Sequence, residues 1–236
     1  MSAVAYHPDF GGPIRYSFEN LPEHPDGQVR DAIARILGYV REDVSDPLIQ
    51  EDAQECLALG EHSGLSYGYQ CINGVWRKIK RSLKFQHDEK TAARLAIDDR
   101  RIPDVVEVIV RPVDQSLLIR RMPHGVEDCD GLEGYASCLL TALGIPCALV
   151  TVSAEPEEPN RFSHVYLACY VDGQRIPVDF SHGPYPGWEC PNTGRLKEWP
   201  VIESPAAQLC SSLAPVFAVT AAYFLYQLYA RRKAIQ

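Results

Sequence analysis

The chain has 236 residues, of which 46% are hydrophobic and 23% charged, a composition that suits a globular core and argues against disorder. Its formal net charge of -8 argues against nucleic acid as the main partner, because phosphate binding needs a basic surface. The local exception is the basic run WRKIKRSLK, residues 76–84, which is typical of the solvated face of an amphipathic helix.

Eight cysteines would allow a disulfide framework, but the N-terminal sequence MSAVAYHPDFGG lacks the basic and then apolar region of a secretory signal. We therefore expect mostly reduced thiols and a reducing compartment such as a bacterial cytoplasm. The sequence contains no CxxC pair and no Cys/His cluster with zinc-finger spacing, so it predicts no structural metal site, and it predicts no cofactor.

Helices are predicted for the N-terminal half of the chain. Residues 1–25, rich in Pro, Gly and His, suggest an extended arm. From residue 26 to about residue 100, apolar residues recur at helical spacing in three segments, which together form a helical lead-in. These segments are DGQVRDAIARILGYVRED, the stretch after Asp46 and Pro47, and YGYQCINGVWRKIKRSLKFQHDE.

The second half of the chain has a different pattern. The run DVVEVIVRP is β-branched and ends in proline, as expected of a short strand. Residues 132–143 place apolar side chains at helical spacing, and Gly144 closes this helix. Three strands follow, and Asp172-Gly173 is a strong signal for a hairpin between the last two. The strands begin at Cys147, Phe162 and Gln174. A helix packed on an antiparallel sheet after N-terminal helices indicates an α+β fold, with residues 101–200 as its core.

Three cysteines fall nine residues apart, and the first of them occupies a special place. Cys129 is expected at the N-terminus of the predicted helix, where unpaired N–H groups and the helix dipole stabilise a thiolate. The neighbouring acids Asp128 and Asp130 oppose that effect. Position alone therefore makes Cys129 a candidate nucleophile without establishing it.

The predicted hairpin provides an independent test of this candidate. If its loop has two residues, Val171 pairs with Gln174, and the residue numbers of every cross-strand pair sum to 345. In this register His164 and Asp179 share one face of the sheet as diagonal neighbours, within reach of a hydrogen bond. A His–carboxylate pair of this kind fixes the tautomer of an imidazole. Together with Cys129 it predicts a nucleophile, its base and the group that orients the base.

With these residues the sequence resembles the transglutaminase-like superfamily of papain-like thiol enzymes, and in particular its phage and prophage branch. The matching segments are EDCDG before a helix that ends LLTALGIP, then SHVYLACYV, then IPVDF. In that family the triad is formed by the Cys of the helix, the His of the following strand and the Asp of the next, which correspond to Cys129, His164 and Asp179. The segments DPLIQEDAQECL, VWRKIKRSLKFQHDE and HGPYPGWECP extend the resemblance over residues 26–200.

One position departs from the family pattern. The phage-type motif reads Gly-Asp-Cys-Asp-Asp, whereas residues 127–131 of this chain read Glu-Asp-Cys-Asp-Gly. Gly131 leaves the predicted triad intact but puts in doubt whatever contact the second acid makes.

The resemblance implies an enzyme in which Cys129 attacks a peptide or carboxamide carbonyl, His164 carries the proton and an acyl-thioester forms. Water as acceptor gives a cysteine peptidase or amidase, and an amine gives a transglutaminase. We favour hydrolysis because the sequence shows no acceptor site. The expected partner is a protein or peptide substrate. The backbone N–H of Cys129 is the expected oxyanion donor, with a second from the helix of Trp76 or the loop of His124.

The C-terminal residues motivate a second hypothesis, a phage virion or membrane-associated structural protein that keeps this fold for docking with little or no turnover. Residues 213–230, LAPVFAVTAAYFLYQLYA, carry no charge and reach the lower limit for a membrane span. The alternative is an apolar C-terminal helix within residues 205–236, buried in the domain or in an oligomer. A virion or a membrane is then an alternative location to the cytoplasm.

Overall fold

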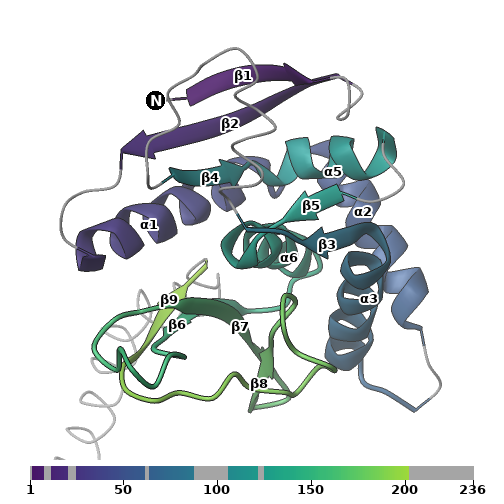
Figure 1. Ribbon diagram of the computed structural model, residues 1–236. Coiled ribbons are helices and arrows are strands. Elements are labelled where there is room, and N and C mark those ends of the chain that lie inside the picture. The colour runs from purple at the N-terminus through teal and green to yellow at the C-terminus, as the bar shows by residue number, and fades with distance from the viewer. Residues whose placement is uncertain are drawn as a thin grey trace, which may run out of the picture. The chain divides into compact units, whose positions relative to one another are not determined.

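The computed structural model describes residues 2–7, 12–20, 25–61, 64–87, 106–121 and 125–201, all within one compact unit that ends at residue 202. Its helices are α1 (Pro25–Asp43), α2 (Pro47–Gly60), α3 (Tyr67–Ser82), α5 (Pro112–Arg121) and α6 (Cys129–Ala142) (Figure 1). Its strands are β1 (Ser2–His7), β2 (Gly12–Asn20), β3 (Leu83–Phe85), β4 (Val106–Val110), β5 (Gly125–Glu127), β6 (Cys147–Val152), β7 (His164–Val171), β8 (Gln174–Val178) and β9 (Leu196–Pro200). The fold is α+β, as predicted.

The C-terminal helix expected within residues 205–236, with its apolar stretch 213–230, lies outside the described residues. Among the described helices, none combines the length and the apolar character that crossing a membrane requires.

Three sheets occur in the described part of the chain. The largest is antiparallel, with the strand order β8-β7-β6-β9. The other two have the order β1-β2-β4 and the parallel pair β3-β5. Strands β1 and β2 occupy the region for which the sequence suggested an extended arm. The segment PIRYSFEN of β2 alternates apolar and polar residues, a period of two that is typical of a strand and that the Pro and Gly content of the region obscured.

Helix α6 is the centre of the hydrophobic core. It contacts α1, α2, α3 and α5 as well as β6 and β7, and Figure 1 shows it between the helices and the large sheet. The sheet turns Leu149, Leu167 and Cys169 toward this core. Its opposite face carries a smaller apolar cluster of buried residues, which are Val150, Val152, Tyr166 and Ala168. The sheet therefore has one face toward α6 and a second, separate apolar face.

The hairpin between β7 and β8 has the predicted register. Val171 pairs with Gln174 and Leu167 pairs with Val178, so the two loop residues are Asp172 and Gly173. These two residues have φ angles of 52° and 76°, as a type I′ turn requires. The prediction made from the Asp-Gly dipeptide is confirmed, and it fixes which side chains share a face at the other end of the hairpin.

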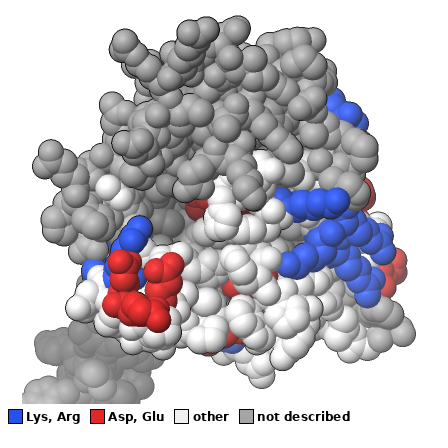
Figure 2. Space-filling model, viewed as in Figure 1, with Lys and Arg blue, Asp and Glu red and all other residues white. Residues whose placement is uncertain are grey.

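A buried carboxylate ties four helices together. Asp52 of α2 accepts a hydrogen bond from Tyr135 of α6 at 2.6 Å and forms ion pairs with Lys78 of α3 at 3.1 Å and Arg120 of α5 at 2.8 Å. Lys78 is only 4% exposed, so the basic run at residues 76–84 is not entirely a solvated face. Figure 2 shows Lys and Arg side chains gathered on the side of the molecule where α3 lies in Figure 1.

Candidate active site

The predicted helix start at Cys129 is confirmed. Asp128 is the N-cap of α6, and its carboxylate accepts hydrogen bonds from the backbone N–H groups of Asp130 at 3.2 Å and Gly131 at 3.3 Å. The chain enters the helix through β5, which pairs with β3, and Gln86 N–H donates to the carbonyl of Glu127 at 2.9 Å. Cys129 is the first residue of the helix and is partly buried. Its thiol is therefore carried on a capped and anchored helix N-terminus.

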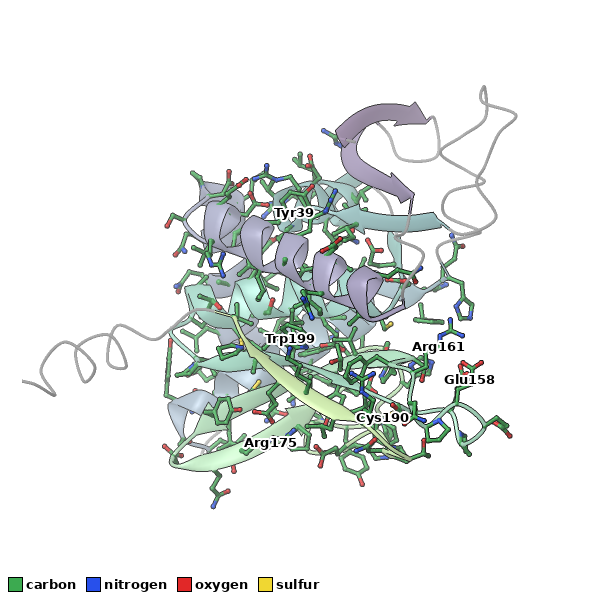
Figure 3. The ribbon with its side chains drawn as sticks, turned by 90° about the vertical axis from the view of Figure 1, so that its left-hand side faces the viewer. Tyr39, Glu158, Arg161, Arg175, Cys190 and Trp199 are labelled. Atoms are coloured by element: carbon green, nitrogen blue, oxygen red, sulfur yellow. The ribbon has the colours of Figure 1, made fainter. Side chains whose placement is uncertain are left out.

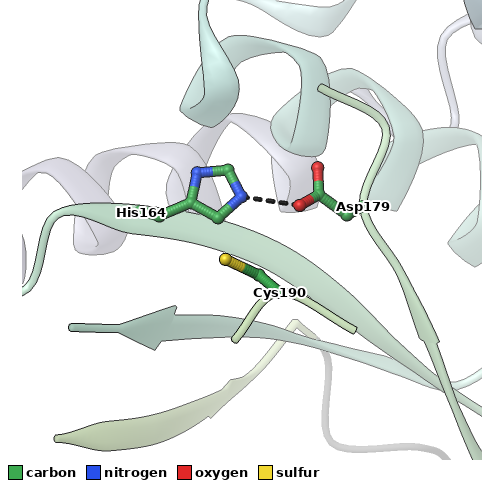
Figure 4. A group of neighbouring side chains, drawn as sticks. All are labelled: His164, Asp179 and Cys190. Carbon is green, nitrogen blue, oxygen red and sulfur yellow. Dashed lines mark hydrogen bonds and ion pairs between the residues drawn. The ribbon is translucent and has the colours of Figure 1, made fainter. Parts of the chain in front are cut away.

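His164 and Asp179 form the hydrogen bond that the hairpin register predicts. His164 is the first residue of β7, Asp179 follows directly after β8, and the distance from Nε2 of His164 to Oδ2 of Asp179 is 2.8 Å (Figure 4). The Asp179 side chain is fully buried and that of His164 is 7% exposed. The pair is therefore held where water cannot easily compete for its hydrogen bond.

The second oxygen of Asp179 has its own set of donors. Oδ1 accepts hydrogen bonds from the backbone N–H of Ser181 at 3.1 Å, the hydroxyl of Ser181 at 2.8 Å and the backbone N–H of His182 at 2.8 Å. Burial alone would raise the pKa of Asp179, but these donors and His164 outweigh it and lower the pKa to about 2. An ionised carboxylate can only accept, so Nε2 of His164 is the donor and Nδ1 of the neutral imidazole carries the lone pair.

Two helices hold the segment that carries Asp179. Glu133, one turn after Cys129 on α6, accepts a hydrogen bond from the backbone N–H of Phe180 at 2.7 Å. Lys80 of α3 donates to the carbonyl of Phe180 at 2.7 Å. The helix of the candidate nucleophile is thus linked directly to the carboxylate that orients the candidate base. Neither Glu133 nor Lys80 was singled out from the sequence, because an acid or a lysine within a helix carries no local signal of burial.

Glu133 gives a testable pH dependence of stability. Burial, and then the nearby charge of Asp179, raise its pKa well above the ordinary value of 4.5. Above that value the unfolded chain loses this proton while the folded chain keeps it, so Glu133 lowers stability as the pH rises. Glu133→Gln keeps an acceptor for Phe180 N–H and has no proton to lose. The free energy of unfolding of the variant, relative to the parent, is expected to increase from about pH 5 to about pH 8 in urea titrations. An unchanged difference between the two proteins would contradict a proton held on Glu133.

A cavity of about 230 Å³ brings Cys129 and His164 to one site. Its wall is formed by α1, the start of α6 and the segment that leads into β7. The lining includes Val29, Ala32, Ile33, Cys129, Phe162 and His164. At its rim Arg161 forms an ion pair with Glu158 at 2.8 Å, and Figure 3 shows these two side chains together. The candidate nucleophile and the candidate base thus line one cavity with a partly apolar wall.

Among the described residues, the other thiols divide into two groups. Five cysteines are buried, and burial raises the pKa of each; they are Cys56, Cys71, Cys138, Cys147 and Cys169. Cys190 is partly buried, and no sequence pattern distinguishes it. Its Sγ, a ring nitrogen of His164 and a carboxylate oxygen of Asp179 all lie within 4.8 Å of one another (Figure 4). Among the described thiols, Cys129 and Cys190 are therefore the two that lie near His164.

The two thiols have different surroundings. Cys129 lines the cavity, whereas Cys190 packs against the apolar cluster on the far face of the sheet. Burial, and then the charges of Asp179 and Glu189, raise the pKa of Cys190 to about 11. A thiol of that pKa stays protonated near neutral pH, which makes Cys190 a weak nucleophile there.

No described residue of α3, the helix of Trp76, lines this cavity, and the second oxyanion donor stays a prediction. Trp76 packs on Phe180 with the ring centroids 5.6 Å apart, and it is not among the described residues that line the cavity. His124, the other candidate, lies outside the described residues.

A close contact explains why residue 131 is a glycine. A Cβ atom built there would lie 2.5 Å from Oε1 of Glu127, with Cγ and Cδ of the same side chain nearer still. Glu127 is fully buried. The buried side chain of Glu127, which precedes the cysteine, therefore fills the space beside position 131.

No protein-family model matches the chain, and no curated protein matches it. One solved structure with some similarity is a candidate cysteine protease from Cytophaga hutchinsonii, with a TM-score of 0.37, 17% identity, and coverage of 72% of this chain and 50% of that chain. Another is Rad4–Rad23 bound to a 6-4 photoproduct UV lesion, with a TM-score of 0.36, 10% identity, and coverage of 64% and 37%. This chain thus spans half of the first structure and less of the second. At these values the two structures define neither a family nor an activity for it.

Proposed function

We propose that the chain is a thiol hydrolase, a cysteine peptidase or amidase in which Cys129 is the nucleophile, His164 the base and Asp179 the group that orients the base. The observation that carries this proposal is the 2.8 Å hydrogen bond between His164 and Asp179 at a cavity that the helix-start Cys129 also lines. The direction of that bond leaves Nδ1 of His164 as the acceptor for a thiol proton.

The proposed reaction has two steps. Nδ1 of His164 takes the proton of Cys129 as Sγ attacks the carbonyl carbon, and the imidazolium then protonates the leaving amine, which gives an acyl-thioester. Water, deprotonated by the same nitrogen, attacks the thioester and releases the acid and the free thiol. Asp179 stays ionised throughout and stabilises the imidazolium. The backbone N–H of Cys129 is the proposed oxyanion donor.

The proposals for the acyl acceptor and for the biological setting rest on the sequence alone. Hydrolysis is proposed over transfer to an amine because the sequence shows no acceptor site, and the substrate is proposed to be a peptide or protein. The phage branch of the resemblance is a hypothesis from the sequence of residues 26–200. A membrane or virion partner through residues 213–230 is a second one, about a part of the chain outside the described residues.

The nucleophile is tested by labelling with a vinyl sulfone probe, followed by peptide mapping. We expect the parent protein to be labelled fastest at Cys129 near neutral pH, with the label lost in Cys129→Ala. Cys190→Ala is the matched control, because it removes the other partly buried thiol near His164, and it should keep the label. Equal labelling of the parent and Cys129→Ala would overturn the proposal, and loss of the label only in Cys190→Ala would assign the reactive thiol to Cys190.

A further inference from the structure

We propose that His164, Asp179 and Cys190 form a binding site for a zinc ion. The three residues come from different parts of the chain: the start of β7, the residue after β8 and the loop before β9. One ligand atom from each lies within 4.8 Å of the other two, so shifts on the order of 1 Å bring all three to the spacing of a tetrahedral ion. Figure 4 shows the Sγ of Cys190 pointing toward the imidazole of His164.

Contacts with two strands hold the loop of Cys190 next to the sheet. The neighbouring residue Glu189 accepts a hydrogen bond from Tyr166 of β7 at 2.6 Å and forms an ion pair with Arg175 of β8 at 2.7 Å. Cys190 itself packs against the apolar cluster that includes Val152 and Tyr166. Because these contacts come from the same two strands that position His164 and Asp179, the three candidate ligands belong to one rigid part of the structure.

The ligand chemistry selects the ion. A thiolate, an imidazole nitrogen and one carboxylate oxygen are a borderline-soft set that suits Zn²⁺, whereas Mg²⁺ and Ca²⁺ prefer oxygen ligands only. Three protein ligands leave the fourth tetrahedral position to water. The thiol of Cys190 gives up its proton to solvent when the Sγ–Zn bond forms, and the proton on Nε2 of His164 moves through solvent to Nδ1, so one proton is released per ion.

Zinc at this site also has a consequence for the thiol, which rests on the proposed function. The ion takes the Nε2 lone pair of His164 and leaves the proton on Nδ1, so the imidazole can no longer accept a proton from Cys129. The ion would therefore be an inhibitor that acts through the base, without touching the nucleophile.

The binding test uses zinc chloride and a chromophoric chelator, with Co²⁺ absorption as the second readout. The parent protein is expected to bind one ion per chain, with a thiolate-to-cobalt charge-transfer band. Cys190→Ser should bind zinc at least about tenfold more weakly and lose the band, because it removes a direct ligand. Cys129→Ser is the matched control and should bind like the parent. Circular dichroism of each variant confirms that it is folded.

Three outcomes overturn the zinc site. They are the absence of one-to-one binding in the parent, binding that survives in folded Cys190→Ser, and binding lost in Cys129→Ser, which would place the ion between Cys129 and His164. None of these readouts depends on turnover. A protein that binds zinc through Cys190 but shows no reactive Cys129 would leave the site standing and overturn only the proposed hydrolase. In a reactive protein, zinc should slow the labelling of Cys129 in the parent and leave Cys190→Ser unaffected.

Discussion

Replacing Asp179 with asparagine is expected to slow the reaction of Cys129 with a vinyl sulfone probe by about 10²- to 10⁴-fold, the range attributed to a positioned general base. The reason lies in the two separate environments of the carboxylate. One oxygen accepts hydrogen bonds from three donors, on Ser181 and His182, and the other accepts a hydrogen bond from His164. An asparagine that keeps its carbonyl oxygen on the three donors must turn its NH₂ group toward His164.

That orientation reverses the tautomer of the imidazole. An NH₂ group facing Nε2 requires a lone pair on Nε2, so the proton moves to Nδ1 and the thiol of Cys129 loses its acceptor. The prediction is specific to this structure, since an asparagine without those three donors could turn its oxygen to the histidine instead. Chemical shifts of the ring nitrogens of ¹⁵N-labelled His164 report the tautomer directly.

Ser181→Ala is the matched control for this experiment. It removes one of the three donors to Asp179 but leaves both backbone N–H groups and the bond to His164 in place. Its labelling rate should fall much less than that of Asp179→Asn, because two of the three donors and the bond to His164 remain. If Asp179→Asn reacts as fast as the parent, the tautomer of His164 is not set by this carboxylate.

Gly131→Asp is expected to destabilise the protein by about 1–3 kcal/mol or more. The new side chain would overlap the buried Glu127, and any movement of Glu127 disturbs β5 and the entry to α6. The measurement is the free energy of unfolding in urea, which is lower in the variant at the same pH and temperature as the parent.

Glu127→Gly tests the cause of this loss of stability. It distinguishes steric overlap with the Glu127 side chain from a general intolerance of side chains at position 131. The double variant Glu127→Gly with Gly131→Asp is expected to be more stable than the sum of the single effects allows, with a coupling of at least about 1 kcal/mol. Gly38→Ala on α1 is a matched control, because a Cβ atom there meets nothing within 4 Å and should be tolerated. Additive effects on the free energy of unfolding in the double variant would show that side chains at positions 127 and 131 do not compete for one space.

Local patterns were enough to predict the elements that carry the candidate site. Helical spacing predicted α6, and Gly144, with a φ of 74°, ends it as expected. The Asp-Gly dipeptide predicted the register of β7 and β8, and through it the bond between His164 and Asp179. These features succeed because each depends on residues close together in the sequence, where periodicity and turn chemistry act directly.

Features that depend on distant contacts could not be predicted in the same way. Strand β9, with the sequence LKEWP, is short and largely polar, so it shows little periodicity. Helix α5 has only ten residues, which also leaves little periodicity to detect. Cys190 reaches His164 only because Glu189 is fixed to two strands, and Glu133 reaches Phe180 only through the packing of α6. Glu127 and Gly131 were visible in the sequence, but only the structure shows that the side chain of Glu127 fills the space beside Gly131.

The order of the cavity residues along the chain, which begins on α1, has a consequence for how the protein folds during synthesis. The residues that line the cavity or contact Asp179 span the chain from Val29 to His182, and Cys129 leaves the ribosome before His164 and Asp179. Contacts so far apart in sequence form late in folding, because the intervening chain must first be ordered. Under the proposed function, a nascent chain that ends after α6 carries Cys129 without His164 and Asp179, so its thiol is not activated until the sheet is complete.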